Sequence, residues 1–385
     1  MTAKFILPFL SLLAFYTTFY FAEINGTSKL VKDIIAEREL PHTLHLIRKQ
    51  YTGYASVDEL LTILVVFFWP ITDGSHLPLS IHSISFAGAL GSTWILITLE
   101  AWRRGNAWKA VAFPMIAGLV AQVLTIAFVA PLYCTLQLFT SVTAARPTPE
   151  NIRIPRAVLN AIPVVFVIGY LVPTGVLLIP WSEDYPPYLK QASFAYWQPW
   201  PAYVSIMLTV VHALFSSFTR NDHNVEGGRA TLSSLRWVYA FAFSLASLSH
   251  IVSWAIPLAA MVLPDIFGNG AEDALHPFVV FGVPKPWETP SLVQEIGEGV
   301  HAFLRWDYLI ASAGVLIWAV SLYQTAHRVV YGRAGFVGLV FKVAALTVLT
   351  GPVGAAVELM WERDELVMNE MGGVRRAAPV GKKVA

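Results

Sequence analysis

Two acidic residues in apolar surroundings, Glu100 and Asp307, are the strongest candidates for chemistry in this sequence. An ionisable group inside an apolar run is costly, and this cost makes it a candidate functional residue. On a helix, Glu100 can meet Arg103 at i+3 and Arg104 at i+4. Glu100 could therefore be a catalytic or substrate-binding carboxyl group, or it could form an ion pair that anchors the end of a helix. The two arginines weigh against a proton donor, because they stabilise the ionised carboxylate.

Asp307 lies between Trp306 and Tyr308, where an apolar run over 304–325 begins. A loop above this position would exclude water, and dry surroundings favour the protonated carboxyl group that a general acid needs. The alternative is an aspartate that accepts hydrogen bonds from the N–H groups at the start of a helix. These residues alone leave both interpretations open.

Histidines and aromatic residues could complete a site. His250 would share a helical face with Trp254 at i+4, although a histidine that hydrogen-bonds between packed helices is the more common case. The chain has 13 Trp, 14 Tyr and 23 Phe, enough to serve more than one purpose. Their rings either form an aromatic belt at the membrane surface or stabilise a carbocation, with a cation–π attraction of about 0.5–2 kcal/mol per ring.

The common motifs of nucleotide, metal and nucleophile sites are absent. The sequence has no P-loop, no GxGxxG after a strand, no HExxH and no GxSxG, and its ten histidines lack metal-ligand spacing. It also lacks the aspartate-rich clusters that hold a magnesium diphosphate. The single cysteine, Cys134, excludes a disulfide framework and a thiolate metal cage. We therefore expect acid–base chemistry with no metal and no other cofactor.

The elements that position these residues must lie in a membrane. Hydrophobic residues make up 56% of the 385 residues and charged residues 13%, which is about half the usual charged share. The mean hydropathy is +0.57. A soluble fold could not bury so much apolar surface, so most of it must face lipid. The net charge of +1 excludes a broad basic surface for nucleic acid.

The apolar runs predict an all-α, polytopic transmembrane helical bundle with about 8–9 spans. The predicted spans are 5–22, 58–73, 77–102, 110–140, 157–181, 201–218, 237–263, 304–325 and 336–361. The 110–140 run is ambiguous, because Pro114 and Pro131 could kink one long helix or mark a re-entrant pair of helices.

A single integral membrane domain over 1–385 is expected, since no internal repeat stands out. Within this domain, we predict a signal anchor and first span over 1–22, a polar loop over 264–303 and a polar C-terminal tail over 362–385.

The arginines give an incomplete orientation. Those at 146, 153, 156, 220, 229, 328 and 333 mark three loops as cytosolic. With nine spans, however, Arg103, Arg104 and the basic C-terminus fall on the opposite side, so the orientation stays open.

Three strings in the sequence together resemble a known family. They are Leu99–Asn106, the loop Pro284–Trp287, and Phe303–Tyr308. The chain resembles fungal integral membrane terpene cyclases of meroterpenoid biosynthesis, of the ascochlorin and ascofuranone type, over most of its length and span pattern. The resemblance implies an enzyme that protonates the terminal epoxide of a farnesyl-type chain on an aromatic polyketide and cyclises the resulting carbocation.

The resemblance also implies site residues and partners. Glu100 and Asp307 would be the catalytic carboxyl groups, one giving and one taking a proton. The implied substrate-binding residues are Trp94, Trp102, Arg103, Asn106, His250, Trp254, Trp306 and Tyr308. The implied partners are a lipophilic prenylated substrate, the lipid bilayer and neighbouring pathway enzymes such as an epoxidase, with no nucleic acid. The implied location is the endoplasmic reticulum membrane.

Two other functions fit the composition. A transporter or exporter of a small metabolite would need a hydrated path with charges near the middle of the membrane. A sterol-isomerase-like enzyme would shuttle protons on an alkene rather than an epoxide. The predicted position of both carboxyl groups near span ends favours a pocket near the membrane boundary over a transport path.

Overall fold

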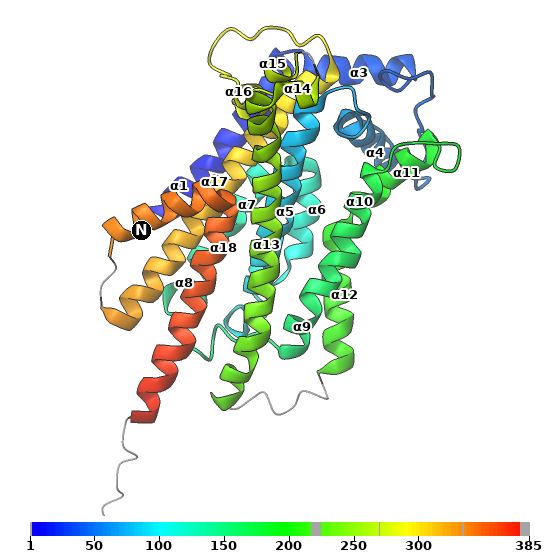
Figure 1. Ribbon diagram of the computed structural model, residues 1–385. Coiled ribbons are helices and arrows are strands. Elements are labelled where there is room, and N and C mark those ends of the chain that lie inside the picture. The colour runs from blue at the N-terminus through cyan, green and yellow to red at the C-terminus, as the bar shows by residue number, and fades with distance from the viewer. Residues whose placement is uncertain (1, 217–224, 269, 333–334, 378–385) are drawn as a thin grey trace, which may run out of the picture.

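The computed structural model describes residues 2–216, 225–268, 270–332 and 335–377, and it forms a bundle of helices (Figure 1). Within these ranges the only β-type pairing is an isolated bridge between Glu39 and Leu46. In the same ranges, six helical segments are long and apolar enough to cross a membrane: Ala3–Ile24, Leu77–Trp102, Arg156–Leu177, Thr231–Val262, Ile296–Tyr331 and Val337–Asn369. The predicted all-α fold is confirmed with six candidate membrane-spanning helices, whereas a count of eight or nine spans is not.

The first half of the chain supplies the central helix and a layer across one end of the bundle. Its elements are α1 (Ala3–Phe15), the π-helical η1 (Tyr16–Tyr20), α2 (Phe21–Ile24), α3 (Thr27–Glu37), α4 (Ala55–Phe68), η2 (Trp69–Ile71), α5 (Leu77–Trp102), η3 (Arg104–Asn106), η4 (Ala110–Ala112), α6 (Pro114–Leu124), α7 (Ile126–Thr140) and α8 (Val142–Ala145). α3 lies across the upper end in Figure 1, and α4 packs against it.

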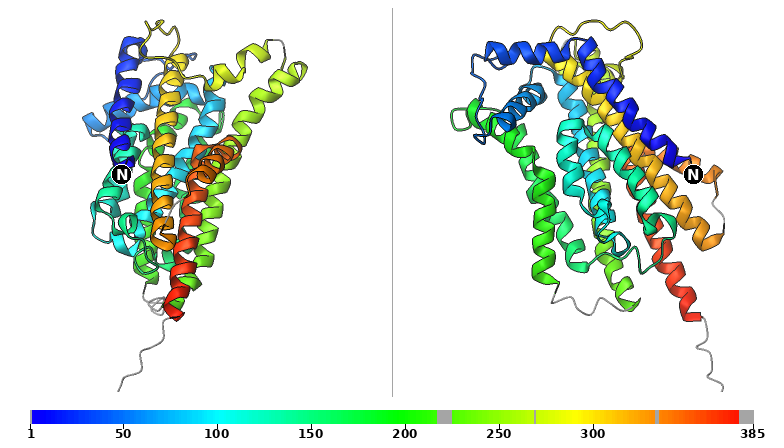
Figure 2. Two further views of the ribbon diagram at one scale, coloured as in Figure 1. Left: turned by 90° about the vertical axis from the view of Figure 1, so that its left-hand side faces the viewer. Right: turned by 180° about the vertical axis from the view of Figure 1, so that it is seen from behind.

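The second half surrounds the central helix. Its elements are α9 (Arg156–Phe166), the π-helical η5 (Val167–Leu171), α10 (Val172–Leu178), α11 (Pro187–Trp197), α12 (Trp200–Phe215), α13 (Val225–Val262), α14 (Pro264–Phe267), α15 (Ala271–Ala274), α16 (Pro277–Phe281), α17 (Ile296–Tyr331) and α18 (Val337–Ala377). α17 packs along α1 and α7 (Figure 2), and α18 bends at Gly351.

The two polar segments predicted from the sequence contain helices. The 264–303 loop holds α14, α15, α16 and the first turns of α17. The tail predicted from residue 362 begins inside α18, where Arg363 and Asp364 are buried, and its last residues, 378–385, lie outside the described part of the chain.

The ambiguous run 110–140 folds as a re-entrant hairpin of α6 and α7. The Nζ atom of Lys109 donates to the carbonyl oxygen of Thr140 at 2.8 Å, so the chain leaves and returns at the same end of the bundle. α6 has 11 residues and extends about 16 Å, half of a hydrocarbon core about 30 Å thick. Pro114 starts α6 and Pro131 lies within α7, and the hairpin turns between them at Thr125.

This hairpin also explains the arginine pattern. The backbone N–H of Arg104 donates to the carbonyl oxygen of Arg153 at 2.9 Å, so the loop after α5 lies beside the loop before α9. Ile152 packs with Ala326 of α17 and Val367 of α18. These loops and helix ends form one end of the molecule, which we call the basic end. Because the hairpin begins and ends at the basic end, it places Arg103 and Arg104 on the same side as the arginines at 146, 153 and 156. The end of α18 is a separate case: α18 bends at Gly351, and its residue Val367 also lies at the basic end.

The contact between α5 and α13 forms the centre of the bundle and depends on small residues. Gly88 of α5 lies so close to α13 that a Cβ atom would overlap Ser249 and approach the carbonyl oxygen of Leu245 to 2.8 Å. Ser92, one turn further along α5, donates to the carbonyl oxygen of Ala242 at 2.8 Å. Small residues allow helices in a membrane to approach closely, and here they hold the central helix in place.

We predict that Gly88→Val destabilises the fold, because the added side chain must displace α13. Overpacking of this kind costs about 1–3 kcal/mol. The expected result is a lower midpoint of thermal unfolding in detergent. Gly175→Ala in α10 is the matched control, since no atom lies within 4 Å of its added Cβ. Equal midpoints for Gly88→Val and the wild type would show that α5 and α13 are not in close contact.

Candidate active site

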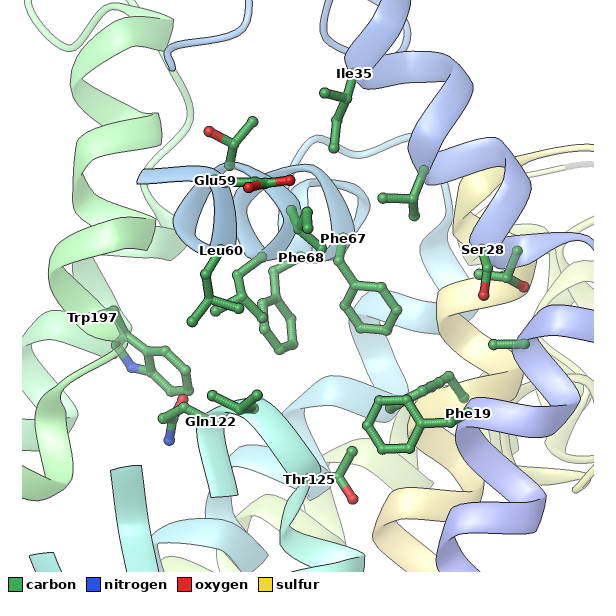
Figure 3. A pocket seen from close by; sticks show the side chains of 18 of the residues that line it. Phe19, Ser28, Ile35, Glu59, Leu60, Phe67, Phe68, Gln122, Thr125 and Trp197 are labelled. Atoms are coloured by element: carbon green, nitrogen blue, oxygen red, sulfur yellow. The ribbon is translucent and has the colours of Figure 1, made fainter. Parts of the chain in front are cut away.

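A cavity of about 970 Å³ lies between the tip of the α6–α7 hairpin and the end of the bundle opposite the basic end (Figure 3). α3 and α4 cover it, and η1, α5, α11 and α17 contribute to its walls. The polar lining is concentrated on α3, on α4 and on the loop before α4, with Lys32, Lys49, Gln50 and Glu59. The volume is at the upper end of the range of about 300–1,000 Å³ that is usual for ligand pockets.

Aromatic rings form a continuous chain around this cavity. Phe303 of α17 contacts Phe19 of η1 and Phe67 of α4, with ring centroids 5.5 and 5.1 Å apart. Phe67 contacts Phe68 at 5.2 Å, and Phe68 contacts Trp197 at the end of α11 at 6.3 Å. All four contacts are edge to face, so ring faces as well as edges are presented to the cavity. Such faces can stabilise a positive charge on a ligand.

Asp307 is the carboxyl group on the hairpin side of the cavity. It follows Phe303 by four residues on α17, so the two side chains share a helical face. Its Oδ1 atom accepts a hydrogen bond of 2.6 Å from the backbone N–H of Ala127, at the start of α7, and the side chain of Thr125 also hydrogen-bonds to it. Only 4% of the residue is exposed, and within the described ranges no cation forms an ion pair with it.

Asp307 lies deeper than the sequence suggests. The predicted span begins at residue 304, but α17 begins at Ile296, 11 residues before Asp307. At a rise of about 1.5 Å per residue, the carboxyl group is about 16 Å along the helix. The polar residues of 296–303 conceal these first turns from a hydropathy profile, although Gly299 and Val300 are buried there.

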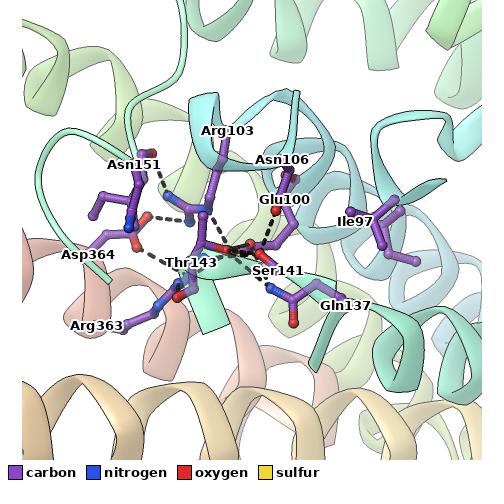
Figure 4. A network of polar contacts seen from close by, with 12 residues as sticks. Ile97, Glu100, Arg103, Asn106, Gln137, Ser141, Thr143, Asn151, Arg363 and Asp364 are labelled. Carbon is purple, nitrogen blue, oxygen red and sulfur yellow. Dashed lines mark hydrogen bonds and ion pairs between the residues drawn. The ribbon is translucent and has the colours of Figure 1, made fainter. Parts of the chain in front are cut away.

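Glu100 lies in a different place, within a buried network of charges near the basic end (Figure 4). Its Oε1 atom accepts hydrogen bonds of 2.6 Å from both Arg103 and Arg363. Its Oε2 atom accepts from Gln137 and from Thr143, each at 3.0 Å. Both carboxylate oxygens are therefore fully engaged, and Glu100 does not border the cavity.

A second carboxylate balances the charge of this network. Asp364 accepts hydrogen bonds of 2.7 Å from Arg103 and from Tyr239. Two carboxylates thus face two guanidinium groups, and all four side chains are fully buried. Because Glu100 belongs to α5 and Arg103 follows it directly, whereas Arg363 and Asp364 belong to α18, the network joins these two helices.

The structure groups only some of the predicted binding residues with a carboxyl group. Arg103 and Asn106 join Glu100, since Asn106 donates to the Glu100 carbonyl oxygen at 2.7 Å. Trp94 packs against Trp200. Trp102 packs against His212.

The remaining four predicted residues lie on other faces of their helices. His250 bonds to the carbonyl oxygen of Val348 at 3.2 Å, and Trp254 stacks on Phe281. Trp306 donates to the carbonyl oxygen of Pro284 at 2.9 Å, and Tyr308 accepts from Ser85 at 3.4 Å. Of the ten predicted site residues, only Asp307 lines the cavity.

Sequence reasoning missed the aromatic residues of the cavity, and only Phe303 could have been found, from its spacing to Asp307. Phe303 precedes Asp307 by one helical turn, whereas Trp306 and Tyr308 are its direct neighbours and must point elsewhere. Phe19, Phe67 and Trp197 come from distant segments that no local pattern connects. Within the described residues, no group of three His, Cys, Asp or Glu side chains is placed to hold a metal ion.

Comparisons with known proteins place the chain in a family. Residues 3–368 match the CtvD domain. Terpene cyclase ctvD of Aspergillus terreus is 31% identical over 92% of this chain and 97% of its own length. Terpene cyclase ascI of Acremonium egyptiacum is 29% identical over 95% of this chain and 92% of its own, and terpene cyclase atmA of Aspergillus flavus is 27% identical over 93% and 97%.

No solved structure matches the chain. The predicted resemblance to fungal terpene cyclases is confirmed by these relatives, which extend over nearly all of the sequence. The chain therefore belongs to the CtvD domain family and is an enzyme of the terpene cyclase type.

Proposed function

We propose that this enzyme protonates the terminal epoxide of a prenylated aromatic substrate with Asp307 and cyclises the resulting carbocation in the cavity of Figure 3. The observation that carries the proposal is the buried carboxyl group of Asp307, which has no ion-pair partner among the described residues and lies on the hairpin side of a cavity lined by aromatic rings. The other buried carboxyl group of the lining, Asp58, accepts hydrogen bonds from three consecutive backbone N–H groups, those of 51–53, that fix the loop before α4. A farnesyl-type chain fits an apolar cavity of about 970 Å³.

The chemistry follows from the surroundings of Asp307. A carboxyl group buried without a counter-ion favours its neutral form, which is the form that donates a proton. Transfer of that proton to the epoxide oxygen breaks a C–O bond and leaves a tertiary carbocation. The rings of Phe303, Phe67 and Phe19 attract this charge, and the apolar lining keeps water away from it.

One carboxyl group is sufficient for the proton balance. Cyclisation changes no atoms in the substrate, so the proton lost from the final cation can return to the Asp307 carboxylate. Glu100 is then a structural residue, since both of its oxygens are engaged by the network that joins α5 to α18.

The proposal includes a setting for the reaction. The substrate is a lipophilic meroterpenoid precursor made in secondary metabolism, and an epoxidase supplies its terminal epoxide. We place both enzymes in the endoplasmic reticulum membrane, where an apolar substrate can pass between them through the bilayer.

We predict that Asp307→Asn abolishes turnover, because an amide cannot donate the proton. The expected loss is about 10²–10⁴-fold, the usual contribution of general acid catalysis. The assay feeds an epoxyfarnesyl-phenol to yeast microsomes that contain the protein, and mass spectrometry follows a new product of unchanged mass.

Glu358→Gln is the control for this experiment, since Glu358 is a half-buried carboxyl group of α18 outside the cavity. Full activity of Asp307→Asn in correctly inserted protein would contradict the assignment of the acid. No product from the wild type with several aromatic head groups would contradict the proposed reaction.

We predict that Phe303→Leu changes the product mixture more than it changes substrate binding. The substitution keeps an apolar side chain but removes the ring face nearest to Asp307 along α17. Loss of about 0.5–2 kcal/mol of cation–π attraction slows the later cationic steps about 2–30-fold. Chromatography should show more of the products that form from early cations. Phe336→Leu, at an exposed ring far from the cavity lining, should leave the mixture unchanged.

We predict that Glu100→Gln destabilises the protein, because it leaves two buried guanidinium groups facing one carboxylate. Removal of one partner from a buried ion pair costs about 3–5 kcal/mol. Adding Arg363→Met restores the charge balance and should recover part of the midpoint of thermal unfolding. Turnover per folded molecule should stay close to the wild-type value in both variants, because Glu100 takes no part in the proposed chemistry. A double variant that is stable but inactive would instead indicate that Glu100 takes part in the chemistry.

A further inference from the structure

The backbone at the tip of the hairpin has an unusual conformation. Thr125 has φ 68° and ψ 156°, a region that is essentially restricted to glycine. A β-branched residue in this region is strained, because its Cβ atom clashes with the backbone. Strain of this kind persists where the surrounding structure requires it, and it is concentrated at functional sites.

The hydroxyl group of Thr125 has two partners that account for the choice of residue. Its Oγ1 atom accepts a hydrogen bond of 3.4 Å from the backbone N–H of Phe128, which caps the start of α7. The same side chain hydrogen-bonds to the Asp307 carboxyl group. Since the hydroxyl accepts from Phe128, its proton is available for donation to Asp307. A glycine at this position would remove the strain but would supply no hydroxyl.

Two donors from the hairpin tip therefore converge on Asp307. The backbone N–H of Ala127 donates to Oδ1 at 2.6 Å, and the Thr125 hydroxyl is the second donor. Both belong to the start of a 15-residue helix, where free N–H groups and the helix dipole favour negative charge. Thr125 and Asp307 both border the cavity, so this arrangement is adjacent to bound substrate.

We propose that Thr125 is a positioning residue for the cyclisation reaction: the Ala127 N–H holds Oδ1 of Asp307, the Thr125 hydroxyl donates to the same carboxyl group, and both stabilise the carboxylate that forms when Oδ2 gives up its proton. This inference rests on the proposed function. In the step, the O–H bond at Oδ2 breaks, a new O–H bond forms at the epoxide oxygen, and the epoxide C–O bond breaks. The negative charge left on Asp307 then lies against the two donors. The final proton from the cyclised cation returns to Oδ2.

The stabilisation acts on charge that develops during the reaction, so it should affect kcat rather than KM. Thr125→Val keeps the shape and the β-branching but removes the hydroxyl. We expect kcat to fall about 10–100-fold with little change in KM. Thr125→Ser keeps the hydroxyl and should retain kcat within about threefold of the wild type.

Thr135→Val is the matched control. Thr135 is a buried threonine of the same helix, its hydroxyl donates to the carbonyl oxygen of Pro131 at 2.8 Å, and it does not border the cavity. Its kcat should equal that of the wild type. Thr125→Gly covers the case in which Thr125→Val fails to insert, because glycine adopts the backbone conformation freely and also lacks the hydroxyl.

The measurements are kcat and KM for the epoxyfarnesyl-phenol in microsomes, normalised to folded protein, with Asp307→Asn alongside. Normal kcat in both Thr125→Val and Thr125→Gly, with an inactive Asp307→Asn, would overturn the role of Thr125 and leave the proposed function intact. A low kcat in Thr125→Ser would also overturn it, since the hydroxyl would then not be the feature that matters. No product from the wild type would instead reject the reaction itself.

Discussion

The hydrogen bond from the Ala127 N–H to Asp307 satisfies a backbone group at the tip of the α6–α7 hairpin, and the position of the hairpin and of the cavity depends on this bond. Irregular backbone within a membrane must have its polar groups satisfied by protein, since lipid offers no partners. The hairpin of α6 and α7 ends near the middle of the bundle, and its turn leaves N–H groups at the start of α7 without helical partners. Thr125 satisfies the N–H of Phe128, and Asp307 satisfies that of Ala127. The carboxyl group proposed for the chemistry thus also allows the chain to turn there.

The two buried carboxyl groups show how surroundings separate structural from chemical roles. Glu100 is held by two arginines, a glutamine and a threonine, so its charge is permanent and its oxygens are occupied. Asp307 has hydrogen-bond donors but no counter-ion, and it borders a cavity. A charged group of the first kind locks helices together, whereas a group of the second kind can exchange a proton. The same residue chemistry therefore serves two purposes in one bundle.

The sequence predicted the features that depend on composition and local spacing. Long apolar runs gave four of the six candidate spans to within six residues at each end. The other two continue about two turns beyond their apolar runs through polar residues, α17 through Glu298 and His301 at its start and α18 through Glu362 to Asp364 near its end. The re-entrant hairpin was one of two alternatives, since Pro114 and Pro131 interrupt the run. The position of the turn at Thr125 was not predictable, because nothing in the local sequence marks a glycine-like conformation at a threonine.

The candidate site was less accessible to sequence reasoning than the fold. Arg103 is close to Glu100 in sequence, so the spacing predicted an ion pair between them. The other partners come from more than 250 residues away: Arg363 bonds to Glu100, and Asp364 bonds to Arg103. The prominent tryptophans drew attention away from the phenylalanines, although it is Phe19, Phe67 and Phe303 that enclose the cavity. Contacts between distant segments decide which aromatic residues share a space, and spacing along one helix does not contain that information.

The hairpin also fixes how the cavity is aligned with the lipid around it. Under the proposed function we place Asp307 near the bilayer midplane, because α6 extends about half the thickness of a hydrocarbon core. We place the polar lining residues Lys32, Lys49, Gln50 and Glu59 toward the surface of one leaflet. An amphiphile dissolved in that leaflet already has its head at the surface and the tip of its tail at the midplane. We infer that such a molecule enters the cavity from the side, without turning over and without crossing water, and that its tail tip arrives at the acid.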